Sequence, residues 1–135
     1  MANALYDLAR QAFLDGDLDW TANNIKVYLI DTGAYTVNLA TDQFANIIAG
    51  GAKIATSGNL ANKTVTAGVA DADDITFTSV SGASCEALVI WQDTGNQATS
   101  RLIAYIDTAT GLPVTPNGNN IDVIWDSGAN KIFKL

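Results

Sequence analysis

The chain lacks histidine altogether, and it contains one cysteine, one methionine and two prolines among its 135 residues. Without histidine, the side chain that most often serves as a general acid or base is missing. The single cysteine, Cys85, has no partner for a disulfide within the chain and no histidine to activate it as a nucleophile. These absences argue against most enzyme classes, and we expect no catalytic residue, no cofactor and no metal.

Basic residues are also scarce. Seven Lys and Arg are scattered along the chain against fourteen Asp and Glu, so the net charge is −7. Proteins that bind nucleic acid or anionic membranes cluster Lys and Arg on one surface. No apolar run approaches the roughly 20 residues that span a bilayer, and Met1–Ala4 lacks the basic start of a signal peptide. We therefore expect neither a nucleic-acid nor a membrane partner, and no secretion.

Apolar residues make up 48% of the chain, whereas charged residues make up only 16%. The apolar content and the length predict one globular domain over residues 1–135. Thr, Asn, Ser and Gln must then form much of the exposed surface. Such a surface suits a protein that buries part of itself against copies or partners.

The first residues carry a helical pattern. Apolar side chains recur at helical spacing, and they are Leu5, Leu8, Ala9, Ala12 and Phe13. The spacing predicts a helix over residues 4–14, with Asn3 as N-cap and Asp15-Gly16 as its end, so that residues 1–15 form an N-terminal helical segment. A second, short helix is predicted after Thr41-Asp42, with Gly50-Gly51 as its stop.

The rest of the chain is rich in strand patterns. Predicted strands cover residues 25–30, 64–70, 75–80, 87–91, 102–106, 121–126 and 131–134. Turn-rich residues 93–100 predict a hairpin of 87–91 with 102–106, and the loop at Gly128 predicts a second hairpin of 121–126 with 131–134. In 121–126, Ile121, Val123 and Trp125 alternate with Asp122, Ile124 and Asp126. The fold class is therefore mainly β: an antiparallel β-sandwich or flattened barrel over residues 25–135, preceded by the short helix.

One motif points to catalysis. Asp31-Thr32-Gly33 follows an apolar strand, as in aspartic proteases, and Asp93-Thr94-Gly95 repeats it. These enzymes need two carboxylates that share one proton, so the chain is compatible with a half-enzyme that dimerises. A third Asp-Thr pair, however, follows a strand at Asp107-Thr108. A repeated turn device explains all three pairs, because Asp accepts local backbone hydrogen bonds at turns, and we favour that interpretation.

Two weaker patterns remain open. Asp71-Ala72-Asp73-Asp74 is either a calcium site or an acidic turn between two strands, and the turn is favoured. Six aromatic side chains are candidates for a sugar-binding surface: Trp20, Trp91, Trp125, Tyr28, Tyr35 and Tyr105. Most of them lie inside predicted strands, where aromatic residues serve packing.

Several segments, taken in order, resemble a known group of proteins. They are residues 16–20, 25–32, 63–66, 71–77, 91–95, 102–107 and 121–126, and they include Gly16-Asp17-Leu18-Asp19-Trp20 and Trp91-Gln92-Asp93-Thr94-Gly95. The chain resembles small β-rich structural proteins encoded in the virion gene clusters of tailed bacteriophages. The shared motifs are strands and turns rather than a catalytic site.

The resemblance implies a non-enzymatic virion component that assembles in the host cytoplasm. It implies a capsid decoration or cement protein as the leading role, with a tail, neck or baseplate component as the alternative. The implied partners are the major capsid protein or other virion proteins, together with further copies of the chain, and a trimer is favoured.

Overall fold

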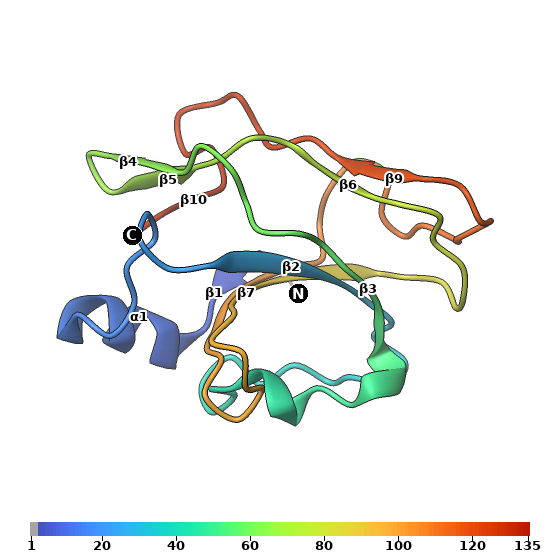
Figure 1. Cartoon of the computed structure of the whole chain (residues 1–135), viewed down its shortest axis with the longest axis horizontal. Coiled ribbons are helices and arrows are strands. Elements are labelled where there is room, and N and C mark those ends of the chain that lie inside the picture. Colours follow the sequence, from blue (N-terminus) through green and yellow to red (C-terminus); the bar gives the residue numbers. More distant parts are fainter. Residues whose placement is uncertain (1–2) are drawn as a thin grey trace.

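The computed structural model describes residues 3–135, and its central element is a five-stranded antiparallel sheet with the order β1-β8-β7-β2-β3 (Figure 1). The bounds are β1 Ala4–Leu5, β8 Leu102–Ile106, β7 Ala87–Gln92, β2 Ile25–Ile30 and β3 Lys53–Thr56. The predicted hairpin of 87–91 with 102–106 is confirmed, because β7 pairs with β8 in antiparallel register.

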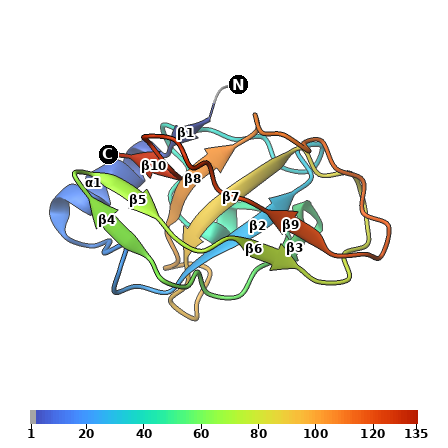
Figure 2. The ribbon, with the colours of Figure 1, turned by 90° about the horizontal axis from the view of Figure 1, so that it is seen from above.

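A second layer lies over one face of this sheet (Figures 1 and 2). It consists of a three-stranded sheet, β10-β5-β4, and a two-stranded sheet, β6-β9. The bounds are β4 Thr64–Thr66, β5 Val69–Asp71, β6 Ile75–Phe77, β9 Ile121–Val123 and β10 Phe133–Lys134. The mainly β, sandwich-like fold is confirmed, and no closed barrel forms within residues 3–135.

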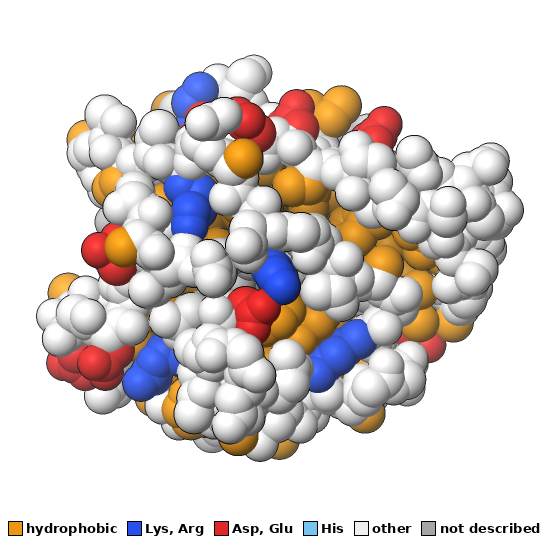
Figure 3. Space-filling model, in the orientation of Figure 1, with side chains coloured by type: hydrophobic (Ala, Val, Ile, Leu, Met, Phe, Trp, Pro, Cys, Tyr) orange, Lys and Arg blue, Asp and Glu red, His pale blue; other side chains and the backbone are white. Residues whose placement is uncertain are grey.

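The other side of the main sheet is covered by the helix α1 (Asp7–Asp15) and by loops. These loops contain two short 3-10 turns, η1 (Ala45–Ile47) and η2 (Gly50–Ala52). All six residues of β7 are buried, because both faces of this strand are covered. The continuous apolar run of β7 follows from that position, since a strand buried on both faces has no solvent side. Apolar side chains are visible between the two layers in Figure 3.

A polar network is buried on the helix side. The Tyr35 hydroxyl donates to Asp42 Oδ2 at 2.6 Å, and it lies 2.9 Å from the Tyr6 hydroxyl. The Asn38 N–H donates to the same carboxylate oxygen at 2.9 Å. Tyr6 stands directly before α1, so the network joins the start of the helix to the 35–42 loop. A buried network of this kind stabilises one arrangement of its elements as long as every donor has an acceptor.

The buried tyrosines predict a loss of stability at alkaline pH. Burial raises the pKa of Tyr28 to about 12, and it also raises the pKa of Tyr6 and Tyr35 above the ordinary tyrosine value. The unfolded chain ionises its tyrosines near pH 10, whereas the folded chain holds these protons to higher pH. Stability present below about pH 10 is therefore lost as the pH rises toward about 12. Thermal melts across this range measure the effect.

Tyr35→Phe supplies the control for this titration. The variant starts from a lower melting temperature but is expected to lose less of it between about pH 10 and 12. Tyrosinate absorbance should develop together with unfolding. A fully folded chain that ionises all its tyrosines near pH 10 contradicts the prediction.

The start of the chain differs from its prediction. The helix α1 spans Asp7–Asp15, and Ala4–Leu5 instead forms β1, which pairs with the edge of β8. Asn3 is not the N-cap, because its side-chain oxygen accepts hydrogen bonds from the N–H groups of Asp107 and Thr108 at 2.9 Å. Gly16 ends the helix as predicted, in the left-handed conformation with a φ of 84°. Of the predicted segment 1–15, residues 1–2 lie outside the described residues.

The predicted single strand 64–70 is a hairpin. Ala67 and Gly68 have φ angles of 51° and 82°, and they form a two-residue turn between β4 and β5. Turns of this kind favour glycine and match the twist of the flanking strands. The predicted strand 75–80 is also shorter, because Ser79 has a φ of 49° and β6 ends at Phe77.

The predicted hairpin of 121–126 with 131–134 is wrong. β9 pairs with β6, and β10 pairs with β5. The stretch 69–77, which contains β5 and β6, thus provides a partner for each of the two strands β9 and β10. Residues 124–132 form the loop between β9 and β10. The predicted helix after Thr41-Asp42 is reduced to η1 and η2, and Gly50-Gly51 lies within η2 instead of ending a helix.

Candidate functional site

The Asp31-Thr32-Gly33 motif forms a tight turn at the end of β2. Asp31 Oδ1 accepts the Gly33 N–H at 2.8 Å. Thr32 donates both its N–H and its hydroxyl to Glu86 Oε1, each at 3.0 Å. The motif therefore joins the end of β2 to the residue that precedes β7. These contacts agree with the interpretation of the motif as a turn device.

The second motif has the same local geometry. Asp93 Oδ1 accepts the Gly95 N–H at 2.8 Å, and the Lys26 ammonium lies 2.7 Å from Asp93 Oδ2. The hydrogen bond from Lys26, and after it the one from Gly95, lowers the pKa of the Asp93 carboxyl below its usual value. A proton-sharing dyad needs one carboxyl that keeps its proton, and Asp93 has the opposite environment.

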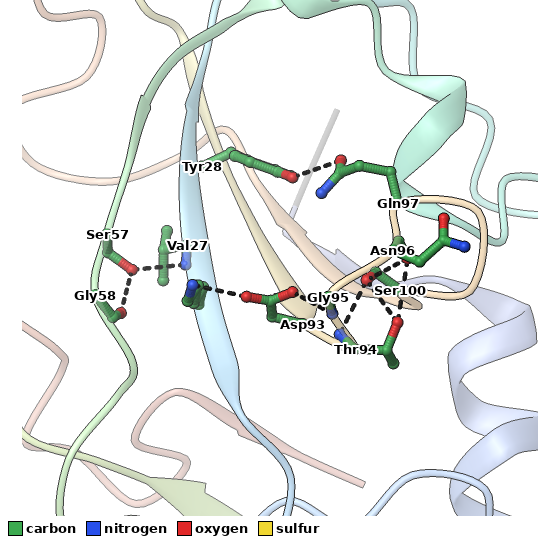
Figure 4. A network of polar contacts seen from close by, with 11 residues as sticks. Val27, Tyr28, Ser57, Gly58, Asp93, Thr94, Gly95, Asn96, Gln97 and Ser100 are labelled. Carbon is green, nitrogen blue, oxygen red and sulfur yellow. Dashed lines mark hydrogen bonds and ion pairs between the residues drawn. The ribbon is translucent and has the colours of Figure 1, made fainter.

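The loop that follows Asp93 is fixed by a local network (Figure 4). Tyr28 and Gln97 point toward one another, and the Tyr28 hydroxyl donates to Gln97 Oε1 at 2.8 Å. The Thr94 N–H donates to the Ser100 hydroxyl at 3.1 Å. These bonds hold the 93–100 loop against the main sheet and leave its polar groups paired with one another.

The two motifs of one chain are held apart by the sheet. Ile30 pairs with Ala87 at one end of the β2–β7 ladder, and Ile25 pairs with Gln92 at the other. Asp31 and Asp93 therefore leave the antiparallel ladder at opposite ends, about 20 Å apart at the usual rise per residue. The two carboxylates cannot form a dyad within one chain.

The acidic segment Asp71–Asp74 serves as a structural turn. Asp73 Oδ2 accepts a hydrogen bond from the Asn62 amide at 2.6 Å. Asp74 Oδ1 accepts the Trp125 N–H at 2.8 Å, and the Asp73 carbonyl accepts the Trp125 indole N–H at 3.0 Å. Within residues 3–135, no group of three or more His, Cys, Asp and Glu side chains is placed to hold a metal ion.

The aromatic candidates are mostly part of the core. Five of the six are at most 6% exposed: Trp20, Trp91, Tyr28, Tyr35 and Tyr105. Side chains at that depth have no face to offer a sugar ring. Cys85 is fully buried, and burial raises its pKa to about 11, so the thiol is a packing group.

The structure brings together one surface that the sequence motifs did not indicate. A hollow of about 220 Å³ lies between the main sheet and β9. Leu29 and Leu88 of the main sheet, together with Val123 and Ile124, are among the residues that line it. A neighbouring hollow of about 420 Å³ shares Leu88, Val123 and Ile124. We call the two hollows together the β9 crevice.

Ile124 gives the β9 crevice its exposed apolar group. Its side chain is 77% exposed, although it lines both hollows. The chain is fixed on either side of it, because β9 pairs with β6 and Trp125 is bonded to Asp73 and Asp74. An isoleucine held in solvent beside leucine and valine side chains can contact a protein partner. Asp122, Asp126 and Lys131 also line the two hollows, so the crevice combines apolar and charged groups.

The sequence did contain the signal for this residue. Ile124 occupies the polar side of the alternating pattern in 121–126, between Asp122 and Asp126. An apolar residue on the solvent side of a strand pattern becomes a candidate interface residue where it adjoins further exposed apolar surface. The hollow beside it depends on how the layers pack, and no local pattern predicts that.

Charged side chains do not gather into one patch on the face that Figure 3 draws. There, Lys and Arg side chains lie as separate small patches, several of them beside Asp or Glu. Two basic side chains form ion pairs with residues distant in the sequence: Lys26 pairs with Asp93, and Arg101 pairs with Asp17. Among the described residues, no helix combines the length and the apolar character needed to cross a membrane.

A comparison with protein-family models finds no match for this chain, and a comparison with curated proteins finds none either.

Proposed function

We propose that this chain is a non-enzymatic structural protein of a tailed-phage virion, and that it decorates and stabilises the capsid. The observation that carries the proposal is the β9 crevice with exposed Ile124, a surface suited to binding another protein subunit. The sequence resemblance to small virion proteins supports the same role. The Asp side chains of the two candidate catalytic motifs, Asp31-Thr32-Gly33 and Asp93-Thr94-Gly95, are used in hydrogen bonds within turns. This use supports a structural role for the motifs and is consistent with the proposal.

In this role the chain acts through mass action. A protein that binds the assembled shell, and not its separated subunits, shifts the equilibrium toward the shell. The major capsid protein is the proposed partner, and a trimer at the three-fold positions of the shell is the proposed arrangement. A net charge of −7 disfavours binding to packaged DNA, which suits an outer-surface position.

The location on the particle is the direct test. Virions of the phage that encodes the chain are purified, and antibodies raised against the chain are used to label them for electron microscopy. Labelling of heads supports the decoration role. Labelling of tails, necks or baseplates supports the alternative structural role instead, and the absence of the chain from purified virions rejects both.

Ile124→Lys is expected to weaken capsid binding at least tenfold, because a charge then replaces the apolar contact. Co-sedimentation of the variant with purified heads measures the effect. Leu14→Lys is the matched control, since Leu14 is 84% exposed on α1 and does not line the β9 crevice. Equal losses in both variants, or no loss in Ile124→Lys, contradict the role of the crevice.

A further inference from the structure

The three-stranded sheet of the second layer has a free edge at β4. β4 pairs with β5 on one side only, and all three of its residues are exposed. In both ribbon views β4 lies at the outside of the molecule, with no strand beyond it (Figures 1 and 2). A free strand edge is a template for pairing with another chain.

The pairing of β5 with β10 determines which way the backbone N–H and C=O groups of β4 point. The Ile132 N–H donates to the Ala70 carbonyl at 3.1 Å, so the polar groups of Ala70 point toward β10. Val65 is the residue opposite Ala70 in β4. The pair is thus a non-hydrogen-bonded pair of the ladder, in which the N–H and C=O of Val65 point away from β5. Val65 presents one free donor and one free acceptor at the edge, beside a side chain that is 54% exposed.

We propose that β4 pairs with β4 of a second copy of this chain, antiparallel about a two-fold axis through Val65. Thr64-Val65-Thr66 reads the same in both directions, as a self-paired edge requires. Each Val65 then donates its N–H to the carbonyl of the other copy's Val65, which makes two hydrogen bonds. Each Thr64 faces a Thr66, and cross-strand pairs of β-branched residues are favourable.

The chemistry of the edge favours a second copy over a charged partner. Residues 64–68 contain no charged residue and no proline, which are the usual devices that block edge pairing. Lys63, the nearest charge, is turned inward and donates to the Asn23 carbonyl. Two chains that each carry a net charge of −7 repel one another, and an uncharged edge is where they approach with least opposition.

The contact is small, and its strength is limited accordingly. Three residues per copy bury far less than the roughly 1,200 Å² of a stable interface, so association in solution is weak. Copies held side by side on a shell experience millimolar effective concentrations, at which a weak contact is populated. The β4 pair itself does not depend on the proposed function. Its use to link neighbouring trimers on a capsid does.

Sedimentation velocity of the full chain at rising concentration, up to about millimolar, tests the proposal. The average mass should rise toward pairs of the smallest species, and more so at high salt, which screens the like charges. Val65→Pro removes the outward N–H and Val65→Lys adds a charge, and each should weaken association at least tenfold. Val65→Thr keeps both the N–H and the β-branched side chain, and should associate as the original chain does.

A folding check and a control variant complete the experiment. Circular dichroism and thermal melts establish that each variant is folded, and Val65→Lys serves if Val65→Pro does not fold. Leu14→Lys adds the same charge at an exposed apolar residue of α1, outside both β4 and the β9 crevice, and should leave association unchanged. The proposal is overturned if the chain stays unassociated at millimolar concentration, if Val65→Lys associates normally, or if Leu14→Lys weakens association as much as Val65→Lys does. The first two outcomes leave the virion role untouched, because capsid binding is assayed separately.

Discussion

Replacing Trp91 with alanine is expected to lower the free energy of unfolding by about 3–5 kcal/mol. Trp91 is 3% exposed in the central strand β7, and its ring stacks on Tyr28 with centroids 4.4 Å apart and planes inclined by 7°. Removing the indole opens a cavity beside Tyr28 and takes away the surface on which Tyr28 packs. Because a domain of this size has only about 5–15 kcal/mol in total, the loss is large. Urea denaturation of both chains measures it.

Trp91→Phe is the matched control. It keeps an aromatic ring beside Tyr28 and removes the indole N–H, which has no hydrogen-bond partner within residues 3–135. The smaller ring leaves a smaller cavity, and the removal of an unpaired buried donor offsets part of that loss. We expect about 1–2 kcal/mol for this variant. Equal losses in the two variants contradict the stacking argument.

The central strands were the part of the fold that the sequence predicted best. β7 and β8 are almost entirely apolar and β2 is interrupted only by Lys26, because these strands are covered on both faces, so their pattern does not depend on distant details. The hairpin of β7 with β8 was predicted correctly, because the turn-rich residues 93–100 leave little choice of partner. Local chemistry was sufficient for this pair, whose strands are neighbours both in the sequence and in the sheet.

The second layer was predicted less well, for two different reasons. Gly68, in the middle of a strand pattern, was a signal for a turn, and it could have separated β4 from β5. The partners of β9 and β10 carried no such signal. Spacing favoured their pairing with one another, but the stretch 69–77 gives each of them a longer-range partner. Only the packing of the whole layer over the main sheet decides between the two.

The candidate site likewise combines features that follow from local sequence with features that depend on long-range packing. The turn role of Asp31 and Asp93 was predicted from their repeated position after strands, and the hydrogen bonds to Gly33 and Gly95 agree with it. The β9 crevice could not be predicted, because its walls come from β2, β7 and β9 and from the loop after β8. Only Ile124, an apolar residue on a polar side, was visible in advance. Interface residues of this kind are found by asking which apolar residues a strand pattern leaves unexplained.

Asp42→Ala is expected to lower the free energy of unfolding by about 2–3 kcal/mol, because it leaves the buried Tyr35 hydroxyl and the part-buried Asn38 N–H without their acceptor. Asp42 is 8% exposed, and its Oδ2 accepts both the Tyr35 hydroxyl and the Asn38 N–H. Asp42→Asn is the matched control, since an amide oxygen in the same place can accept both bonds. We expect about 1 kcal/mol for that variant, by the difference between charged and neutral acceptors. Denaturant titration of both variants measures the losses.

The double variant Asp42→Ala/Tyr35→Phe separates the network from a simple sum of contacts. Tyr35→Phe alone should cost about 2 kcal/mol, since it removes the hydroxyl between Tyr6 and Asp42. In the double variant, the Tyr35 hydroxyl is no longer present to be left unpaired in the core. The combined loss should therefore be smaller than the sum of the single losses by about 1 kcal/mol or more. Strict additivity would show that Asp42 and Tyr35 act independently, and that the start of α1 is held in place by packing alone.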